Sequence, residues 1–167
     1  STEQQLRYLI NKWGIDPIYV RPDYLLDLTG QRLSEIRRAV AKGLERVKDD
    51  SVIVVTTCQP GYKQLDLSSI AQKEKTSQNS LAKRITDGLA EISLHIYKKS
   101  NGSISCYFSS GGDMSASLCK LSGASGIELI DEVFPLAAYG YFIEGDLDNV
   151  PVVTKGGLIG DKTAISK

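Results

Sequence analysis

The sequence predicts an α/β protein of three layers, in which a mainly parallel, mixed sheet has helices on both faces. Segments with helical spacing of apolar residues alternate with short β-branched segments, which is typical of parallel strands connected by helices. Ser51–Thr57 is almost entirely β-branched, as expected of a central strand covered on both faces. Tyr139–Ile143 and Val150–Thr154, joined by a short polar turn, are expected to add an antiparallel hairpin at one end of the sheet.

Helices are expected where apolar residues recur at alternating spacings of three and four positions. The first runs from about Thr2–Trp13 and ends at Gly14, because glycine is favoured just after a helix. The second covers Gln31–Lys48 and the third Ser77–Tyr97. A shorter helix is expected over Ser115–Leu121.

Shorter strands and loops are expected between these helices. Asp16–Val20 reads as a short strand, broken by Arg21 and Pro22, and Ile127–Ile130 as another strand. Cys58–Thr76 is expected to be an exposed loop with one helical turn. It follows a central strand, and α/β sheets bind their ligands near the carboxyl ends of such strands.

Composition excludes several classes of function. The chain of 167 residues is expected to form one domain with its own core. Lysine plus arginine equals aspartate plus glutamate at 20 each, so no net charge attracts nucleic acid or an anionic membrane. No apolar run approaches the roughly 18 residues that a membrane helix needs. Three cysteines without metal-type spacing indicate a reduced cytoplasmic setting, in which they serve as buried small apolar residues.

A glycine turn between a strand and a helix is the first candidate site. The alternating strand that contains Cys106 stops at Gly111 and Gly112, and Asp113 or Ser115 is expected to cap the following helix. Glycines let the backbone approach a ligand, and the free N–H groups of a first helical turn attract anions. The same turn is equally compatible with a purely structural role.

A second glycine cluster, Lys155–Gly160, follows the apolar strand that ends at Thr154. Neither cluster fits the Walker pattern or the dinucleotide fingerprint, so together they predict a nucleotide or phosphate site and nothing narrower. Lys155 either bridges phosphate oxygens or extends its amine into water. Asp113 either holds Mg²⁺ through water or serves as the helix cap.

Other polar groups favour structural roles. Asp146 and Asp148 are expected in a solvated hairpin turn rather than a metal site. His95, the single histidine, has no serine or cysteine partner that the sequence justifies, which favours a structural role. Catalytic residues and a protein-held metal site are not identified.

Four stretches resemble the C-terminal nucleotide-binding domain of the four-carbon acid sugar kinase family, and in order and spacing the match covers nearly the whole chain. The last of them is the most specific. They are the Thr-x-x-Gln helix start Thr2–Leu6 with the strand and Leu-Leu of Ile15–Leu26, the loop Ser110–Ala116, the acidic segment Ile130–Pro135, and the closing Lys-x-Gly-x-x-Gly motif within Val152–Gly160.

The resemblance implies a kinase that uses ATP and Mg²⁺ to phosphorylate a four-carbon sugar acid of the threonate, erythronate or 3-oxo-tetronate class. The C-terminal domain of such an enzyme holds ATP or ADP, and an N-terminal domain holds the sugar acid. By this resemblance the first wall of the nucleotide site consists of Gly111, Gly112, Asp113 and Met114, and the second of Gly156, Gly157 and Gly160. Lys155, which begins the second motif, is also expected to bind the nucleotide.

Departures from the family pattern leave alternatives open. Met114 stands where the family has threonine, and Phe134–Leu136 lacks the glycine expected after proline. The chain is expected to be one part of a two-domain kinase, beginning after a Gly-Ser strand and lacking the sugar-acid domain, so that it binds nucleotide without turnover. The alternatives are a degenerate regulatory domain and a different phosphate-binding α/β enzyme.

Overall fold

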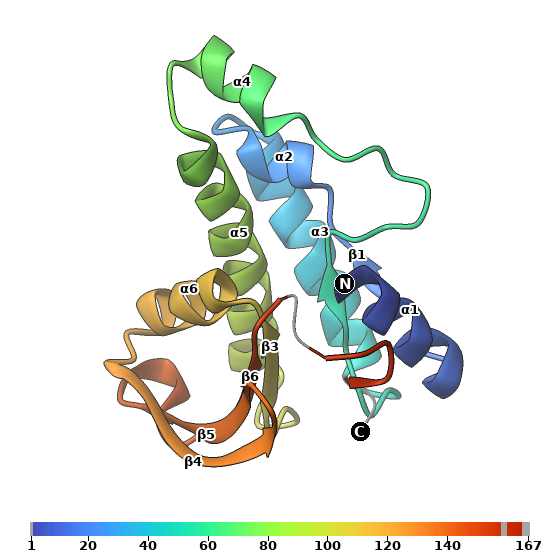
Figure 1. The fold of residues 1–167 in the computed structure, drawn as a ribbon, viewed down its shortest axis with the longest axis vertical. Helices are drawn as coiled ribbons and strands as arrows, with labels where there is room; N and C mark the ends of the chain where they lie inside the picture. The colour runs from blue at the N-terminus through green and yellow to red at the C-terminus, as the bar shows by residue number, and fades with distance from the viewer. Residues whose placement is uncertain (1, 158–159, 165–167) are drawn as a thin grey trace.

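The computed structural model describes residues 2–157 and 160–164 (Figure 1). Helix α4 lies at one end of the molecule and the β4–β5 hairpin at the other, with the long helix α5 between them. In chain order the elements are α1 (Thr2–Trp13), β1 (Ile18–Tyr19), α2 (Pro22–Leu26), α3 (Gln31–Arg46), β2 (Val55–Thr56), α4 (Leu67–Glu74), α5 (Gln78–Lys99), β3 (Tyr107–Ser110), α6 (Gly112–Ser122), β4 (Gly126–Phe134), β5 (Ala137–Ile143), the 3-10 turn η1 (Gly145–Leu147) and β6 (Pro151–Lys155).

The described strands form two sheets, and the α/β class is confirmed. Strand β1 pairs in parallel with β2. The other sheet has the order β3-β6-β5-β4, in which β3 and β6 are parallel while β4, β5 and β6 are antiparallel neighbours. The predicted hairpin is therefore present as β5 and β6, joined through η1. The larger sheet is therefore mixed, with one parallel pair and two antiparallel pairs.

Local sequence accounts for the helices. Helix α1 ends at Gly14, whose φ of +64° suits glycine. The hydroxyl of Ser77 caps α5 by accepting a hydrogen bond from the N–H of Ser80 at 3.0 Å. Helices α3 and α5 then pack together with β1 over one apolar cluster. Its buried members are Ile18, Val20, Leu25, Ile36, Ala39, Val40, Ile92 and Ile96.

A second apolar cluster lies between α5, α6 and the four-stranded sheet. Phe142 of β5 is buried at its centre and meets the ring of Tyr107 edge to face, with 6.0 Å between the ring centroids. Leu118 of α6 and Leu94 of α5 belong to the same cluster. This packing fixes α6 on the sheet at the point where β3 ends.

A buried carboxylate ties β1 to α3. The side chain of Glu35 accepts hydrogen bonds from the backbone N–H of Arg21 at 2.8 Å and from the guanidinium of Arg38 at 2.7 Å. Burial by itself raises the pKa of Glu35, but these hydrogen bonds outweigh it and hold the pKa below its usual value. Glu35 is therefore ionised and fully bonded in the fold at neutral pH.

The prediction that Ser51–Thr57 is a central strand covered on both faces is wrong for the described chain. Within this segment only Val55 and Thr56 form a strand, and among the described residues that strand pairs with β1 alone, along one of its edges. Their side chains are half-buried and that of Val52 is exposed. The β-branched composition predicted the strand correctly, but which strands would flank it depends on contacts that are distant in sequence.

Two helices were not expected. Pro22 was read as a break but stands in the first turn of α2, where its fixed φ is compatible with a helix. The segment predicted as a loop with one turn contains the whole of α4, capped by the carboxylate of Asp66. The prediction of buried cysteines is also wrong for Cys106, which is exposed; Cys58 and Cys119 are half-buried.

Within the described residues, no helix combines the length and apolar character that crossing a membrane requires.

Candidate functional site

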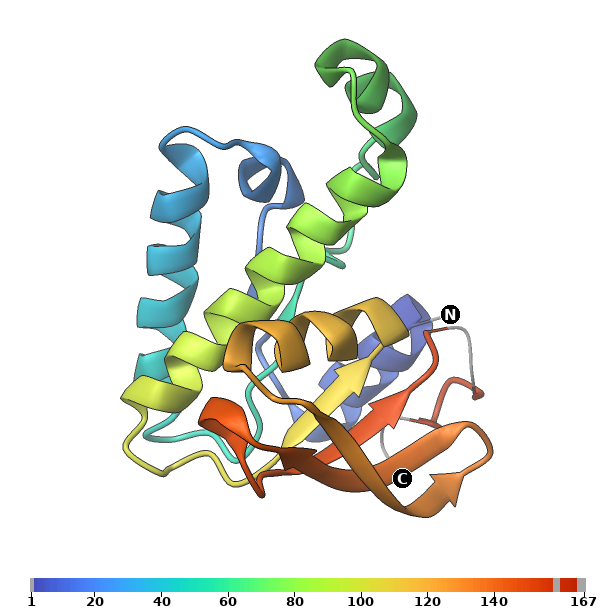
Figure 2. The ribbon, with the colours of Figure 1, turned by 90° about the vertical axis from the view of Figure 1, so that its left-hand side faces the viewer.

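The two glycine loops lie side by side at one edge of the larger sheet. Strands β3 and β6 are parallel and adjacent, with Ser110 opposite Lys155, so both loops leave the sheet at its carboxyl edge (Figure 2). The backbone N–H of Gly111 donates a hydrogen bond to the carbonyl of Lys155 at 2.8 Å. Loops that are more than forty residues apart in sequence thus form one continuous backbone surface.

The first loop opens helix α6 without a side-chain cap. Gly111 is the N-cap residue, with φ +106° and ψ 133°, so the prediction that Asp113 or Ser115 caps the helix is wrong. The N–H groups of Met114 and Ser115 both donate to the carbonyl of Gly111, at 3.1 and 3.2 Å. The N–H groups of Gly112 and Asp113 have no hydrogen-bond partner within residues 2–157 and 160–164.

The first-turn amides can therefore serve an anion. Gly112 is exposed, and a Cβ built on it meets no atom within 4 Å, so open space lies beside its backbone. The positive end of the helix dipole adds to the attraction. A phosphate group brought to this turn would find two N–H donors already oriented, with no side chain in the way.

Two serine hydroxyls hold the loop in this shape. The hydroxyl groups of Ser109, which is buried in β3, and Ser115, in the first turns of α6, lie 2.9 Å apart. Because one residue is on the strand and the other on the helix, their hydrogen bond fixes the angle at which the helix leaves the strand. Gly111 lies between these two serines in the chain, so the same hydrogen bond spans the glycine turn.

Lys155 ends β6 with its side chain almost fully buried at 3% exposure. Its Nζ donates a hydrogen bond to the carbonyl of Gly156 at 2.6 Å, so of the two alternatives for Lys155 the amine extended into water does not hold. Burial lowers the pKa of this amine from its ordinary value. The second loop thus begins beside a buried amine.

The second loop continues through Gly156 and Gly157 to Gly160, with Leu158 and Ile159 outside the described residues. Gly160 has φ +86°, and a Cβ built on it would lie 2.4 Å from that of Ala164, so only glycine fits. The amide of Gln5 donates to the carbonyls of Gly160 and Asp161 at 3.0 and 2.9 Å. Buried Gln5 thereby attaches α1 to this loop.

Gln5 was not among the predicted site residues. The signal was present as the glutamine of the Thr-x-x-Gln pattern at the start of α1, three positions after Thr2. That pattern identifies a helix start but does not indicate which carbonyl groups the glutamine contacts. Only the folded chain shows that it reaches a loop about 155 residues away.

The remaining predicted residues of the first loop differ in their surroundings. Asp113 is exposed in the first turn of α6, where a carboxylate is available to a cation that accompanies phosphate. The side chain of Met114 is half-buried and packs against the apolar cluster around Phe142. Met114 thus contributes its backbone to the loop and its side chain to the core.

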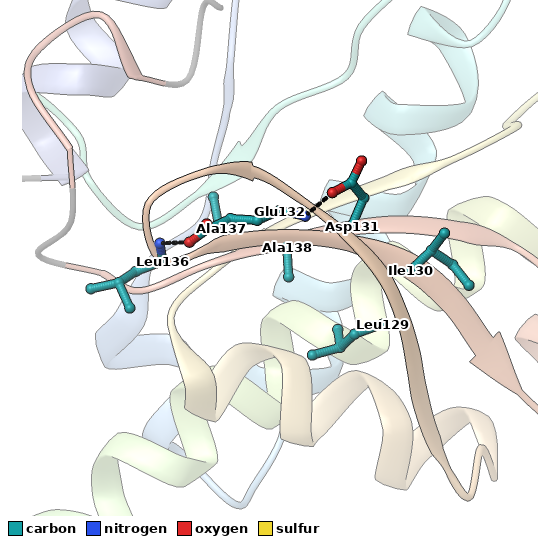
Figure 3. A pocket seen from close by; sticks show the side chains of 7 residues that line it. All are labelled: Leu129, Ile130, Asp131, Glu132, Leu136, Ala137 and Ala138. Carbon is teal, nitrogen blue, oxygen red and sulfur yellow. Dashed lines mark hydrogen bonds between the residues drawn. The ribbon is translucent and has the colours of Figure 1, made fainter.

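The acidic segment leads into a hairpin tip beside the second loop. An open pocket of about 290 Å³ lies on the hairpin. Beside it the side chain of Asp131 accepts from the N–H of Glu132, and that of Glu132 accepts from the N–H of Leu136 (Figure 3). Leu136 occupies the position after Pro135 where glycine was expected, and it adopts φ +65°. Its carbonyl accepts from the N–H of Gly156 at 3.5 Å. The turn shape is therefore reached without glycine.

The other polar groups that the sequence singles out lie away from the two glycine loops, in the β5–β6 turn and on helix α5. The carboxylate of Asp148 accepts from the N–H of Glu144 and the amide of Asn149, within the turn between β5 and β6. Asp146 forms an ion pair with Lys98 at 2.6 Å, and His95 lies on an exposed helix face beside Glu91. Within the described ranges, no three histidine, cysteine or acidic residues are grouped as a metal site requires.

Comparison with known proteins gives consistent matches over nearly the whole chain. The family model described as a nucleotide-binding C-terminal domain matches residues 1–165. A D-erythronate kinase from Heliobacterium modesticaldum is 37% identical over 163 residues, which are 98% of this chain and 37% of that protein. A D-threonate kinase from Salmonella typhimurium is 25% identical over 133 residues, or 80% of this chain and 28% of that protein.

A solved structure shares the fold. It is the crystal structure of a domain of unknown function from Bordetella bronchiseptica, obtained with bound citrate as a domain-swapped dimer. Its TM-score is 0.65 at 19% identity, and the match covers 99% of this chain and 37% of that one. In each of these comparisons the chain spans well under half of the protein that it matches.

Proposed function

Because the chain belongs to the four-carbon acid sugar kinase family as its nucleotide-binding C-terminal domain, we propose that its two glycine loops hold the phosphates of ATP. The observation that carries this proposal is the pairing of the loops at one sheet edge, where Gly111 donates to Lys155 and the next two N–H groups have no partner among the described residues. A triphosphate needs several donors at close range, and this edge supplies them from backbone.

Each predicted residue except Met114 has a role in this proposal. The N–H groups of Gly112 and Asp113 bind phosphate oxygens, and Gly111 gives the backbone the turn that points them outward. The buried amine of Lys155 adds positive charge from the second loop. Gly156, Gly157 and Gly160 form the second wall, which Gln5 holds in place through the carbonyl of Gly160.

Mg²⁺ is proposed to accompany the nucleotide. The described residues fit this cation only as a phosphate-bound ion, because Asp113 is the exposed carboxylate of the first loop and no three-residue metal group exists in the described ranges. Mg²⁺ usually keeps several waters and binds through one or two carboxylates plus phosphate oxygens. When bound, it would neutralise charge that builds up as phosphate is transferred.

For the whole protein we propose transfer of the γ-phosphate of ATP to a hydroxyl of a four-carbon sugar acid of the threonate, erythronate or 3-oxo-tetronate class. Support comes from the two relatives named as D-erythronate and D-threonate kinases. The chain matches only 37% and 28% of their lengths, so we assign the sugar acid mainly to a separate N-terminal domain. We also propose a cytoplasmic location, where free thiols stay reduced.

Calorimetric titration of Mg²⁺ and ADP into the 167-residue chain tests nucleotide binding, with the longer protein as control. We expect saturable binding in both, and tighter binding in the longer protein. A folded protein that shows no heat of binding at millimolar ADP in either form would refute the proposal. Thermal shift with ADP, NAD and a sugar phosphate in parallel separates the kinase from other phosphate-binding enzymes.

One alternative has a specific observation in its favour. Met114 stands at the family's threonine position and packs into the apolar cluster, so the loop lacks a hydroxyl there. This favours a regulatory domain that keeps the fold without phosphate transfer. A full-length protein that binds ADP but does not phosphorylate any four-carbon acid would support this alternative over the kinase.

A further inference from the structure

The pocket on the β4–β5 hairpin lies apart from the backbone donors that are proposed to bind phosphate. Its volume is about 290 Å³. Pockets that enclose a whole small molecule span about 300–1,000 Å³, so this one suits a single flat ring system rather than a complete nucleotide. Its lining includes the side chains of Leu129 and Leu136 and the first two residues of β5, Ala137 and Ala138 (Figure 3).

The pocket lies at the same edge of the sheet as the two glycine loops. Strand β5 begins at Ala137, which pairs with Lys155. Lys155 in turn pairs with Ser110, the residue before Gly111. Neighbouring strands are about 4.8 Å apart, so the pocket begins about 10 Å from the first glycine loop. An extended nucleoside diphosphate spans such a distance between its terminal phosphate and its base.

The pocket also opens on the face of the sheet that α6 covers. Ala138 and Phe142 are four residues apart on β5 and share a face, and Phe142 packs with Leu118 of α6. Leu129 of β4 pairs with Gly140, which lies on that same face. The pocket and the first turn of α6 are therefore on one side of the sheet, with no strand between them.

Strand β4 is shaped irregularly where it lines the pocket. Its pairing with β5 is interrupted twice, so that Ile130 and Val133 have no partner residue on β5. Such bulges bend a strand and are common next to functional sites. Leu129, Ile130 and Val133 are all exposed, although each is a large apolar side chain. The bent strand thus offers an apolar surface to a ligand.

Leu136 joins the pocket to the second glycine loop. Its N–H donates to the carboxylate of Glu132 at 2.9 Å, and its carbonyl accepts from the N–H of Gly156 at 3.5 Å. It has φ +65°, which glycine adopts without strain and leucine does not, and its side chain is 68% exposed. A strained residue with an exposed apolar side chain indicates a contact that glycine could not make.

Charge determines which part of a nucleotide suits this pocket. Its lining includes the carboxylates of Asp131 and Glu132. Between Leu121 and Thr154 the sequence has no lysine, arginine or histidine. A phosphate group or the carboxylate of a sugar acid would be repelled here, because no nearby cation on the hairpin offsets the two negative charges. An uncharged aromatic base meets no such repulsion.

We propose that this pocket receives the adenine ring of the nucleotide whose phosphates bind the two glycine loops, an inference that rests on the proposed nucleotide-binding function. The ring packs against Leu129 and Ala138. Leu136 lies where the nucleotide passes from the pocket to the second glycine loop. Binding of the base therefore depends on β4 and β5, while binding of the phosphates depends on the first turn of α6 and the end of β6.

Calorimetric titration of the full-length protein with ADP and, separately, with pyrophosphate tests this division, both in the presence of Mg²⁺. Leu129→Ser removes an apolar contact with the base, so ADP affinity should fall at least about tenfold while pyrophosphate affinity stays the same. The matched control is Val133→Ser, which changes an exposed apolar residue of the same strand outside the pocket lining. It should leave both affinities unchanged.

Leu136→Gly separates base binding from stability. Glycine relieves the strain at φ +65°, so the melting temperature should stay the same or rise. Loss of the exposed side chain should still weaken ADP binding at least about fivefold. A residue with only a structural role would not lower ADP affinity in a variant that is at least as stable as the natural protein.

Photolabelling with 8-azido-ADP locates the base directly. Trypsin cleaves after lysine and arginine, so it releases Leu121–Lys155, which contains the whole hairpin, as one peptide. We expect the label in this peptide, measured by mass spectrometry. An excess of ADP should abolish the label, and Leu129→Ser should reduce it at equal concentrations of the reagent.

The possible failures are distinguishable. An unchanged ADP affinity in Leu129→Ser, or label confined to other peptides, would overturn the assignment of the pocket. An equal loss in Val133→Ser would also overturn it, because the effect would then not be specific to the pocket. Pyrophosphate binding as tight as that of ADP would remove the base pocket and leave the phosphate loops in place. Absence of binding by either ligand would refute the proposed function as well.

Discussion

The two glycines that open α6 allow the proposed phosphate loop to be tested apart from the stability of the fold. Gly111 has φ +106° and ψ 133°, and a Cβ built there meets no atom within 4 Å. In Gly111→Ala the cost is therefore backbone strain and not a steric clash. A non-glycine residue held in such a region costs about 1–3 kcal/mol.

Gly112→Ala is the matched control, one residue away. Gly112 begins α6 with no positive φ, and a Cβ there also has no neighbour within 4 Å. Alanine at a compatible position stabilises by about 0.4–1 kcal/mol through the unfolded chain. Since melting temperature changes by about 2–4 °C for each kcal/mol in a protein of this size, the two variants should move it in opposite directions.

ADP binding should respond differently from stability. A methyl group on Gly112 occupies the open space beside the N–H groups of Gly112 and Asp113. We therefore expect Gly112→Ala to weaken ADP binding at least tenfold, or about 1.4 kcal/mol. Gly111→Ala should weaken binding and lower stability together. Calorimetry and thermal melting of both variants measure these effects. Unchanged ADP affinity in Gly112→Ala would show that the loop is a structural turn.

Three further predictions follow from single side chains. Lys155→Met removes a buried amine and keeps a side chain of similar apolar volume, so the melting temperature should stay the same or rise. ADP affinity, measured by calorimetry, should fall at least about tenfold. An unchanged affinity would show that Lys155 is not part of the nucleotide site. Met114→Thr places a hydroxyl against the apolar cluster and should lower stability by about 1–3 kcal/mol. In the full-length protein, a large gain in the rate of phosphorylation would show that the natural site is degenerate. An unchanged rate would show that the site with Met114 is already active. Glu35→Gln should lower stability by about 1–3 kcal/mol at pH 7, because the hydrogen bonds of Glu35 are charge-assisted. The pKa of Glu35 is depressed in the folded protein, so its contribution to stability is present above the unfolded pKa of about 4.3 and disappears as the pH falls through the folded pKa. Denaturant unfolding of the natural protein and of Glu35→Gln at pH 7 and pH 3 measures this loss. An equal stability difference between the two proteins at both pH values would contradict a stabilising charge on Glu35.

Elements with strong local signals could be predicted from the sequence. Helix α1 has its predicted bounds, and α3 ends two residues earlier than expected, because apolar periodicity and the glycine at position 14 are local properties. Helix α4 was missed because Asp66, its capping residue, lies in a polar segment that also reads as a loop. Pro22 was misread because proline is both a helix breaker and a favoured first-turn residue.

The site could be predicted in part for the same reason. Both glycine loops were recognisable because glycine next to a strand end is a local pattern. Their contact through Gly111 and Lys155 depends on parallel pairing across a long sequence separation. The burial of Lys155, the inward direction of Met114 and the reach of Gln5 depend on tertiary packing in the same way. None of these three could be read from neighbouring residues.

The position of β6 has a consequence for biosynthesis. Pro151–Lys155 is the last strand described along the chain, yet it lies inside the sheet, between β3 and β5. A nascent chain on the ribosome can pack α3 against α5 early, but β3 must wait until Lys155 emerges. Exposed strand edges are prone to wrong association during such a delay. The bond between Gly111 and Lys155 forms in that same late step, so the two glycine loops come together only when the sheet closes.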